Sequence, residues 1–525
     1  MAPAASLLVA CLAAAAYLPS AASLPPTDNE STNFGPSEAA ARQNAFSIFN
    51  AIHSAMRQWG SSLHHNGMSL FLATVPAGVA LYHGDSAPDP PPGPEWLAFE
   101  IEHAELFAHP RYERPPPPRH RTPPPPGARQ HPLRLVHIEE SQSPDPQPGH
   151  GYGYLHLYRT TAPLHLLYLD GTSAGKTATM GTLDTQDLLL RLNRSAPAED
   201  DAGRARALCD DVVVPWGLHG LVRMEAGFEI IKCAGFLDGL EMISAQRRPV
   251  HRVLGQGEDN NNKGDRTRVE RFEFIRAVAQ RYRGIGAGRV VVDWSSMVSG
   301  LFYEVDLGEV DDDMPRLVGL TDEELRGIRG RVEEVVGARK GREGKAVVDW
   351  QGVVDLVVGR YADRIRDMAE AVGSLEEMQG EVDSLLNTYI DYAVEDEGYR
   401  ESARRCAKHY TWSAVPGTQE DKLILTAIET VMLDICSTLF EVRRVVVEDP
   451  AEHRDALRQA REAVQGLMGR LRWTRWKECV GCGHNEVCFV PMWPFGDAPS
   501  HERPNCRNAS TLEDGWRDNS YWHAF

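Results

Sequence analysis

Nine cysteines, one of them in an apolar amino-terminal segment, constrain this chain more than any other feature. The segment from Ala4 to Leu18 is almost purely apolar, and small residues follow it, which is the layout of a secretory signal peptide. The segment is shorter than the roughly 20 residues of a membrane-spanning helix. We therefore expect residues 1–22 to be a removed signal peptide and the mature protein to be secreted and extracellular.

Eight cysteines remain once residues 1–22 are removed. An even number of cysteines in an oxidising compartment predicts up to four disulfide bonds. We expect the pairs Cys209–Cys233 and Cys406–Cys436, because each closes a loop within one predicted domain. The other four cysteines would then form two bonds within the carboxy-terminal tail.

A zinc site is the alternative for the tail. Cys479 and Cys482 have the C-x2-C spacing of zinc ligands, but Cys488 and Cys506 form a widely spaced second pair. In a secreted chain this arrangement favours disulfides. Three N-glycosylation sequons fit the secretory route and predict a glycoprotein. They begin at Asn29, Asn193 and Asn508.

The net charge disfavours one class of partner. The chain has 55 Lys and Arg residues against 74 Asp and Glu residues, which gives a formal net charge of −19. Sequence-independent binding to nucleic acid or to an anionic membrane surface needs a basic face. Beyond the signal peptide, no uninterrupted apolar run of spanning length is apparent. We expect no nucleic-acid partner and no membrane contact after signal removal.

The chain is expected to be α+β, with a mixed amino-terminal domain over residues 40–255. Apolar residues at helical spacing predict a helix at 40–59, and short apolar runs bounded by Pro and Gly predict strands. Proline density over residues 110–150 is typical of extended chain and indicates a surface insertion in this domain. The predicted strands lie at 68–75, 79–84, 95–100, 154–160 and 164–170.

A mainly helical domain is expected over residues 266–475. Thr321 and Glu324 have the spacing of a capping box. Val-Val-Asp-Trp occurs twice before an apolar run, so Asp293 and Asp349 are both predicted to be helix N-caps. Longer helices are expected at 370–395, 418–446 and 451–474. The tail over residues 476–525 is expected to be loop-dominated and held by cross-links rather than by a core of its own.

A glycine-rich segment follows the predicted strand at 164–170. Its order, Asp170-Gly-Thr-Ser-Ala-Gly-Lys-Thr177, superficially resembles a phosphate-binding loop. The spacing between Gly171 and Gly175 is one residue short of the G-x4-G-K-[ST] pattern. We therefore expect a glycine-rich turn that exposes Lys176 rather than a nucleotide site.

Several short motifs occur in a characteristic order in the first half of the chain. Tyr-His-Gly at 82–84 ends a predicted strand, a second strand ending at Phe99 leads into a helix that carries Ala104, and Phe228-Glu229 begins a late strand. This order resembles the histidine-type branch of the ADP-ribosyltransferase superfold. The resemblance implies a split sheet, NAD as a substrate and a protein as a possible acceptor of ADP-ribose.

The resemblance also implies roles for single residues. His83 would hydrogen-bond the ribose of NAD, and Gly84, beside Tyr82, would let the nicotinamide amide meet the backbone. Phe99 would lie where the family has an aromatic residue that stacks on nicotinamide.

The catalytic group implied by the resemblance is Glu229, with Glu225 as the alternative. A carboxylate there would orient a ribose hydroxyl and stabilise the positive charge that develops at C1′ in the transition state. The implied activity is ADP-ribosyl transfer or NAD hydrolysis.

Two further interpretations stay open. The chain also resembles a group of secreted fungal proteins of unknown role through NGMSLFLATVP, DGTSAGKT, GTLDTQD, RMEAGFE and MWPFG. A non-catalytic binding or structural protein is one alternative to an NAD-using enzyme. The other is a carbohydrate-active hydrolase using carboxylates near 95–105, where Glu100, Glu102 and Glu105 surround His103.

Overall fold

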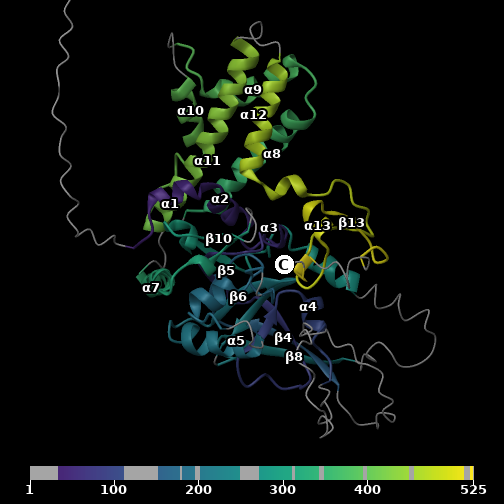
Figure 1. The fold of residues 1–525 in the computed structure, drawn as a ribbon. Coiled ribbons are helices and arrows are strands. Elements are labelled where there is room, and N and C mark those ends of the chain that lie inside the picture. The colour runs from purple at the N-terminus through teal and green to yellow at the C-terminus, as the bar shows by residue number, and fades with distance from the viewer. Residues whose placement is uncertain are drawn as a thin grey trace, which may run out of the picture. The chain divides into compact units, whose positions relative to one another are not determined.

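The fold is taken from a computed structural model of the 525-residue chain (Figure 1). The chain divides into two compact units, Met1–Phe34 and Gly35–Phe525, and nearly all described residues belong to the second. The structure describes residues 34–110, 152–177, 180–195, 201–233, 235–248, 271–309, 314–341, 348–393, 399–448, 455–512 and 521–523. The signal peptide, most of the proline-rich insertion and the sequon at Asn29 lie outside these residues.

A nine-stranded sheet is the centre of the amino-terminal half. Its strand order is β8-β4-β2-β3-β7-β6-β5-β1-β9, and β5 and β6 run parallel whereas the other neighbouring strands are antiparallel. The five strand segments expected from apolar runs all form strands. The strands are β1 (Ser69–Val75), β2 (Ala80–Asp85), β3 (Glu95–Ala98), β4 (Gly153–Thr160), β5 (Leu164–Leu169), β6 (Gly220–Glu225), β7 (Gly227–Lys232), β8 (Leu240–Arg248) and β9 (Val291–Ser299).

The two faces of this sheet carry different side chains near its middle. Directly paired residues on neighbouring strands share a face, and consecutive residues alternate. Tyr82 pairs with Ala98, Ala98 pairs with Glu229, and Glu229 pairs with Arg223, so these four residues share one face. The opposite face carries apolar residues of the main core, among them Leu81, Leu97, Ile230 and Val222.

Helices form the layers around the sheet and the carboxy-terminal bundle (Figure 1). The expected helix at 40–59 is three short helices, α1 (Glu38–Gln43), α2 (Ala45–Ser54) and α3 (Gln58–Leu63), and α4 (Ile101–Glu105) lies on the polar face. A further helix covers 271–279. The remaining helices are α5 (Asp201–Leu208), α7 (Asp322–Gly337), α8 (Trp350–Glu370), α9 (Leu375–Leu386), α10 (Tyr399–Lys408), α11 (Gln419–Arg443), α12 (Ala456–Leu471) and α13 (Ala498–Glu502).

α11 packs against α10, α12, α9 and α2, which makes it the central helix of the bundle. The helical segment Gln419–Val447 is long and apolar enough to cross a membrane by length and composition alone. More than half of its most apolar window, 56%, is buried by the rest of the chain. That burial is what a core helix of a bundle shows, so its apolar character is explained by packing.

One expectation for the carboxy-terminal half is wrong. Asp293 is no N-cap, because it lies within β9 opposite Leu72 and its segment completes the edge of the sheet. The matching aspartate, Asp349, does cap α8 and accepts a hydrogen bond from Gly352 N. Valine-rich strands and buried helices cannot be told apart by apolar content alone, which is why two similar segments fold differently.

The tail shares a core with the rest of the chain. Val487, Phe489 and Met492 are buried in one cluster with Phe274 and Ala226, so packing on other segments adds to the cross-links that hold the tail. Two short strands pair within it, β12 (Val487–Phe489) and β13 (Asn505–Arg507). Beyond the tail, two-residue strands pair at β10 (Gly308–Glu309) and β11 (Pro315–Arg316).

The disulfide prediction is confirmed. Cys209 bonds Cys233 and Cys406 bonds Cys436. In the tail the bonds are Cys479–Cys488 and Cys482–Cys506. All four tail cysteines are therefore consumed, and the zinc alternative for the tail is overturned.

Candidate functional site

A tight hairpin between β6 and β7 brings three charged side chains to one face of the sheet. Arg223 pairs with Glu229, and Glu225 pairs with Gly227, so Arg223, Glu225 and Glu229 point the same way. Gly227 has φ of +111°, and a Cβ there would lie 2.9 Å from Nδ1 of His103. Glycine at this turn therefore allows His103, from α4, to approach the carboxylates.

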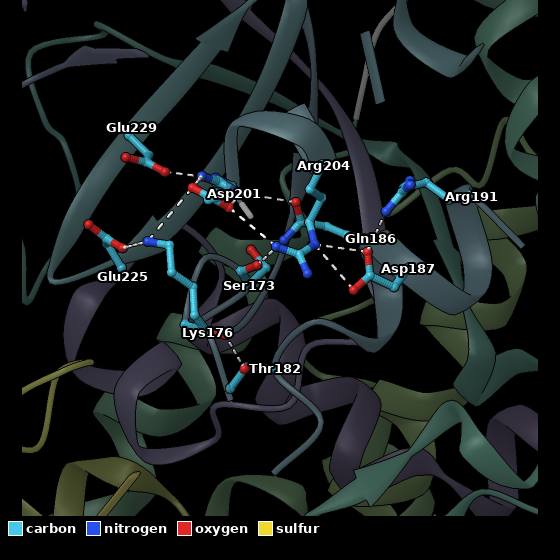
Figure 2. A network of polar contacts seen from close by, with 12 residues as sticks. Ser173, Lys176, Thr182, Gln186, Asp187, Arg191, Asp201, Arg204, Glu225 and Glu229 are labelled. Carbon is cyan, nitrogen blue, oxygen red and sulfur yellow. Dashed lines mark hydrogen bonds and ion pairs between the residues drawn. The ribbon is translucent and has the colours of Figure 1, made fainter. Parts of the chain in front are cut away.

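The carboxylates are held by two cations (Figure 2). Arg223 Nε donates to Glu229 Oε1 at 2.7 Å, and Lys176 Nζ lies 2.8 Å from Glu225 Oε2. Asp201, the first residue of α5, links the two cations, with its Oδ2 2.6 Å from Arg223 Nη2 and 3.7 Å from Lys176 Nζ. These interactions form one network from two strands, a loop and a helix.

Further ion pairs extend the network away from the hairpin. Arg204 Nε lies 2.9 Å from Asp187 Oδ1, and Arg191 Nη1 lies 3.2 Å from the same oxygen. Gln186 accepts from Arg223 Nη1 at 3.1 Å and donates to Ser173 O, so it ties the glycine-rich loop to the network (Figure 2). Four acids (Asp187, Asp201, Glu225, Glu229) face four bases (Lys176, Arg191, Arg204, Arg223), a balance that offsets the cost of burying charge.

Burial sets the protonation states in the network. Burial raises the pKa of Glu229 to about 7, even though Arg223 acts in the opposite direction. Burial alone would raise the pKa of Asp201, but Arg223 and Lys176 lower it to about 2. Burial disfavours charged Lys176, but Glu225 and Asp201 outweigh it and raise the pKa of the amine. The site therefore combines one carboxyl with a raised pKa, Glu229, with Asp201 and Lys176, whose pKa shifts favour their charged forms.

His103 is a neutral side chain at the edge of this cluster. Burial lowers its pKa, against the opposing charges of Glu225 and Glu100. Its Nε2 lies 4.0 Å from Glu225 Oε1, and its buried Nδ1 has no hydrogen-bond partner among the described residues. One ligand atom from each of His103, Glu225 and Glu229 lies within 4.8 Å of the other two. These three residues could hold a metal ion if their side chains moved until each ligand atom lay about 2.0–2.2 Å from the ion.

Exposure falls from one side of the site to the other. The side chains of Lys176, Asp201, Glu225 and Glu229 are 31%, 20%, 12% and 8% exposed, and Arg223 is fully buried. Solvent therefore reaches the site past Lys176. The indole ring of Trp493, from the tail, lies at this entrance with Lys176 Nζ 4.4 Å from its centroid. Lys176 is exposed, as the sequence predicted, and its ammonium group also pairs with Glu225.

The structure does not bring His83 and Glu229 together. His83 follows Tyr82 in β2 and therefore points to the face opposite Glu229. His83 Nδ1 bonds Trp96 O at 2.7 Å, and its ring packs near His156 and Phe236. The expectation that the imidazole and the carboxylate line one cleft is wrong in this geometry.

The three residues expected to bind NAD lie in packed surroundings. Tyr82 packs against a small cluster that contains Ala98 and Ala104. A Cβ on Gly84 would lie 2.1 Å from Ala104 O, so α4 covers this backbone. Phe99 is only 2% exposed. Of the residues expected from the resemblance, only Glu225 and Glu229 share a site.

The carboxylates near 95–105 do not form a pair. Glu100 is buried and forms an ion pair with Arg281, whereas Glu105 pairs with Arg248 and Glu102 is exposed. From this segment, the histidine between the acids, His103, belongs to the candidate site.

Sequence reasoning did not place five residues in this site: Lys176, Asp201, Arg223, His103 and Trp493. Three of them carried a signal, because a lysine in a glycine-rich loop and the charged RMEAGFE hairpin are rare in buried segments, and His103 stood among acids. Trp493 carried none, since nothing in the sequence indicates which surface the tail covers.

Comparison with known proteins gives relatives of unknown activity. The model of the YPL277C N-terminal domain family matches residues 38–147 and 136–255, which include Glu225, Glu229, His103 and Lys176. Uncharacterized protein YOR389W of Saccharomyces cerevisiae is 24% identical over 521 residues, covering 86% of this chain and 82% of that protein. Uncharacterized protein YPL277C of the same yeast is 32% identical over 213 residues, which cover 38% of this chain and 42% of that protein.

The chain is homologous to these yeast proteins. The matches support an uncharacterised fungal family, as the resemblance to fungal proteins of unknown role suggested, and they do not extend to the ADP-ribosyltransferases. No solved structure matches the chain. Function must therefore be argued from the site.

Proposed function

We propose that this protein is a secreted hydrolase that cleaves a glycosidic bond, with Glu229 as the acid and Glu225 as the nucleophile. The observation that carries the proposal is a pair of neighbouring carboxyl groups in unlike environments. Burial raises the pKa of Glu229 to about 7 although Arg223 pairs with it at 2.7 Å, whereas the less buried Glu225 pairs with an ammonium group at 2.8 Å. Two carboxyl groups whose surroundings separate their protonation states are the usual basis of acid–base catalysis at neutral pH.

The separation of the carboxylates suits a retaining mechanism. Ligand oxygens of Glu225 and Glu229 lie within 4.8 Å of each other. Retaining glycosidases have carboxyl groups about 5–5.5 Å apart, whereas inverting enzymes leave about 6.5–9.5 Å for a water molecule. We therefore expect the anomeric configuration to be retained.

The chemical steps follow from these positions. Glu229 donates its proton to the leaving atom of the glycosidic bond, while a Glu225 oxygen forms a bond to the anomeric carbon. Water then attacks that carbon, gives a proton to Glu229 and releases Glu225 as a carboxylate. Lys176 Nζ holds one Glu225 oxygen at 2.8 Å, and His103 Nε2 lies 4.0 Å from the other.

The test is a pair of isosteric substitutions. Glu229→Gln and Glu225→Gln should each lower kcat/KM by at least about 100-fold, the usual contribution of a general acid or a nucleophile. The measurement is release of reducing sugar or chromophore from a panel of aryl glycosides and oligosaccharides, with NMR of the product anomer. His83→Gln is the matched control, because His83 lies on the opposite face and should retain activity. Full activity of folded Glu229→Gln would refute the assignment.

NAD belongs in the same panel, because its nicotinamide is held by an N-glycosidic bond. The expected NAD-dependent activity stays a proposal that now depends on Glu225 and Glu229 without His83. Nicotinamide release that is lost in Glu229→Gln and kept in His83→Gln would identify NAD as the substrate. Loss in His83→Gln instead would restore the sequence-based assignment.

Export is part of the proposal. Four disulfide bonds among the described residues favour an oxidising compartment. Glycosylation at the sequons of Asn193 and Asn508 is supported by their partly exposed positions. Mass spectrometry of the secreted protein before and after endoglycosidase treatment tests this part.

A ligand-binding role without chemistry is the second candidate. A cavity of about 430 Å³ lies between the start of α8 and the edge strand β9, and its lining includes Trp294, Val291, Ile285 and Arg57. This volume is in the range of small-molecule sites, roughly 300–1,000 Å³. Thermal-shift screening of the wild-type chain and of Val291→Glu would detect a ligand that occupies this cavity.

A further inference from the structure

The cross-linked tail reaches the candidate site through one aromatic residue. Lys176 Nζ lies 4.4 Å from the ring centroid of Trp493, within the range of a cation–π contact. Trp493 is half-buried and packs against Met180, Tyr521 and Trp522. The indole ring is therefore fixed by its own neighbours before it meets the ammonium group.

The tail also touches the other side of the same site. Ala226, which lies between Glu225 and Gly227, is buried in one cluster with Met492. Phe495 packs on Phe274 with centroids 6.0 Å apart, and Phe274 packs on His103 at 5.7 Å. The tail therefore contacts the amine through Trp493, the hairpin through Met492 and the residue that packs on the imidazole through Phe495.

We propose that Trp493 is a positioning residue that holds the Lys176 ammonium group against Glu225, which makes the cross-linked tail part of the site. A lysine ammonium is a point charge on a flexible four-carbon stem, so a salt bridge alone leaves it several rotamers. The side chain of Lys176 is 31% exposed, and water competes for its ammonium group. A fixed aromatic face favours the rotamer in which the ammonium group also meets Glu225.

The position of the tail disulfides follows from this role. Cys479–Cys488 and Cys482–Cys506 close loops immediately before and around Trp493. Each closed loop limits the conformations that the tail can adopt. Removing the bond between Cys482 and Cys506 should loosen Trp493 and thereby free Lys176.

The experiment measures the reactivity of the lysine and needs no substrate. Amine labelling at fixed pH, read by mass spectrometry, reports how firmly Lys176 is held as an ammonium ion. Lys422, which is exposed on α11, is the internal standard. Trp493→Leu keeps an apolar side chain but removes the π face, and Trp493→Phe keeps a ring.

We expect Trp493→Leu to raise the labelling rate of Lys176 relative to Lys422 by about two- to fivefold, the equivalent of one partly exposed cation–π contact. Trp493→Phe should restore most of the wild-type rate. The double variant Cys482→Ser/Cys506→Ser should raise the rate, and Trp412→Ala, at an 87% exposed residue, should leave it unchanged.

Equal labelling of Lys176 in wild type and in folded Trp493→Leu would overturn the proposal. An equal rise in the Leu and Phe variants would do the same, because it would indicate packing alone. The catalytic consequence rests on the proposed function: Trp493→Leu should lower kcat and shift the acid side of its pH profile. Changed labelling without any hydrolase activity would leave Trp493 as the positioning residue and refute only the hydrolase.

Discussion

Buried acids in this protein differ in whether a cation accompanies them. Asp201 has Arg223 and Lys176 beside it, whereas Asp170 accepts a hydrogen bond from Ser69 N at 2.9 Å and lines a small cavity of about 60 Å³. Burial raises the pKa of Asp170 to about 7, whereas the cations hold the pKa of Asp201 at about 2. The same residue type therefore has opposite effects on stability at two sites.

Asp170→Asn should stabilise the protein above neutral pH. The folded-state pKa of about 7 is above the unfolded value near 4, so the folded state keeps a proton that the unfolded state loses between these values. Stability of the wild type therefore falls as pH rises from about 4 to about 7. The variant removes this loss, which is on the order of 4 kcal/mol at pH 8 for a shift of about three pKa units. Denaturant titrations at pH 4, 6 and 8 measure the effect.

Asp201→Asn is the control, because it is expected to change stability in the opposite direction to Asp170→Asn. Its lowered pKa gives stability that is present above about pH 4 and lost as pH falls toward about 2. The variant should be less stable than wild type at pH 7. If both variants shifted stability in the same direction at pH 8, the assignment of their protonation states would be wrong.

At the scale of elements, capping boxes begin two of the helices in the described part of the chain, and the two boxes differ in their further contacts. Thr321 and Glu324 form the box that the sequence predicted at α7, and it is exposed. Thr418 and Asp421 form a second box at α11, and Asp421 Oδ1 also accepts a hydrogen bond from Trp350 Nε1 at 2.7 Å. The second cap therefore fixes the start of α11 against the start of α8.

Thr418→Ala should destabilise the protein more than Thr321→Ala. Loss of an exposed cap costs about 1 kcal/mol. At Thr418 the hydroxyl also donates to Ser295 O at 3.1 Å, so we expect a total cost of about 2 kcal/mol from the cap and the second bond. Thr418→Ser retains both bonds and should be close to wild type. Urea titrations of the three variants measure the difference, and equal costs for the two alanine variants would contradict it.

Sequence patterns predicted which segments form strands better than they predicted which segments lie next to one another in the fold. Short apolar runs gave β1 to β5 because each strand carries its own signal. The order of the strands depends on long-range pairing, which no local pattern encodes, and this order separates His83 from Glu229. The same limit explains why Trp493 was missed and why β9 was expected to be a helix.

At the scale of the whole molecule, one core joins the sheet and the helical bundle. Phe71 of β1, Trp294 of β9 and Trp473 near the end of α12 belong to the same buried cluster. Arg57 and Asp355 add a bidentate ion pair of 2.7 and 2.5 Å between the start of α3 and α8. The domain boundary that the sequence predicts between residues 255 and 266 stays a prediction. The buried cluster contains residues from both sides of it.

A shared core predicts that the two halves unfold together. Trp350 of α8 is completely buried, so Trp350→Ala should cost about 3–5 kcal/mol and lower one common transition. The measurement is hydrogen exchange during a denaturant titration, followed separately for β6 and β7 and for α11. Coincident transitions in wild type, and an equal downward shift of both in Trp350→Ala, are expected of a single cooperative unit. Loss of protection in α11 while β6 and β7 stay protected would show that the sheet is stable without the bundle, and the common core would then contribute little to the candidate site.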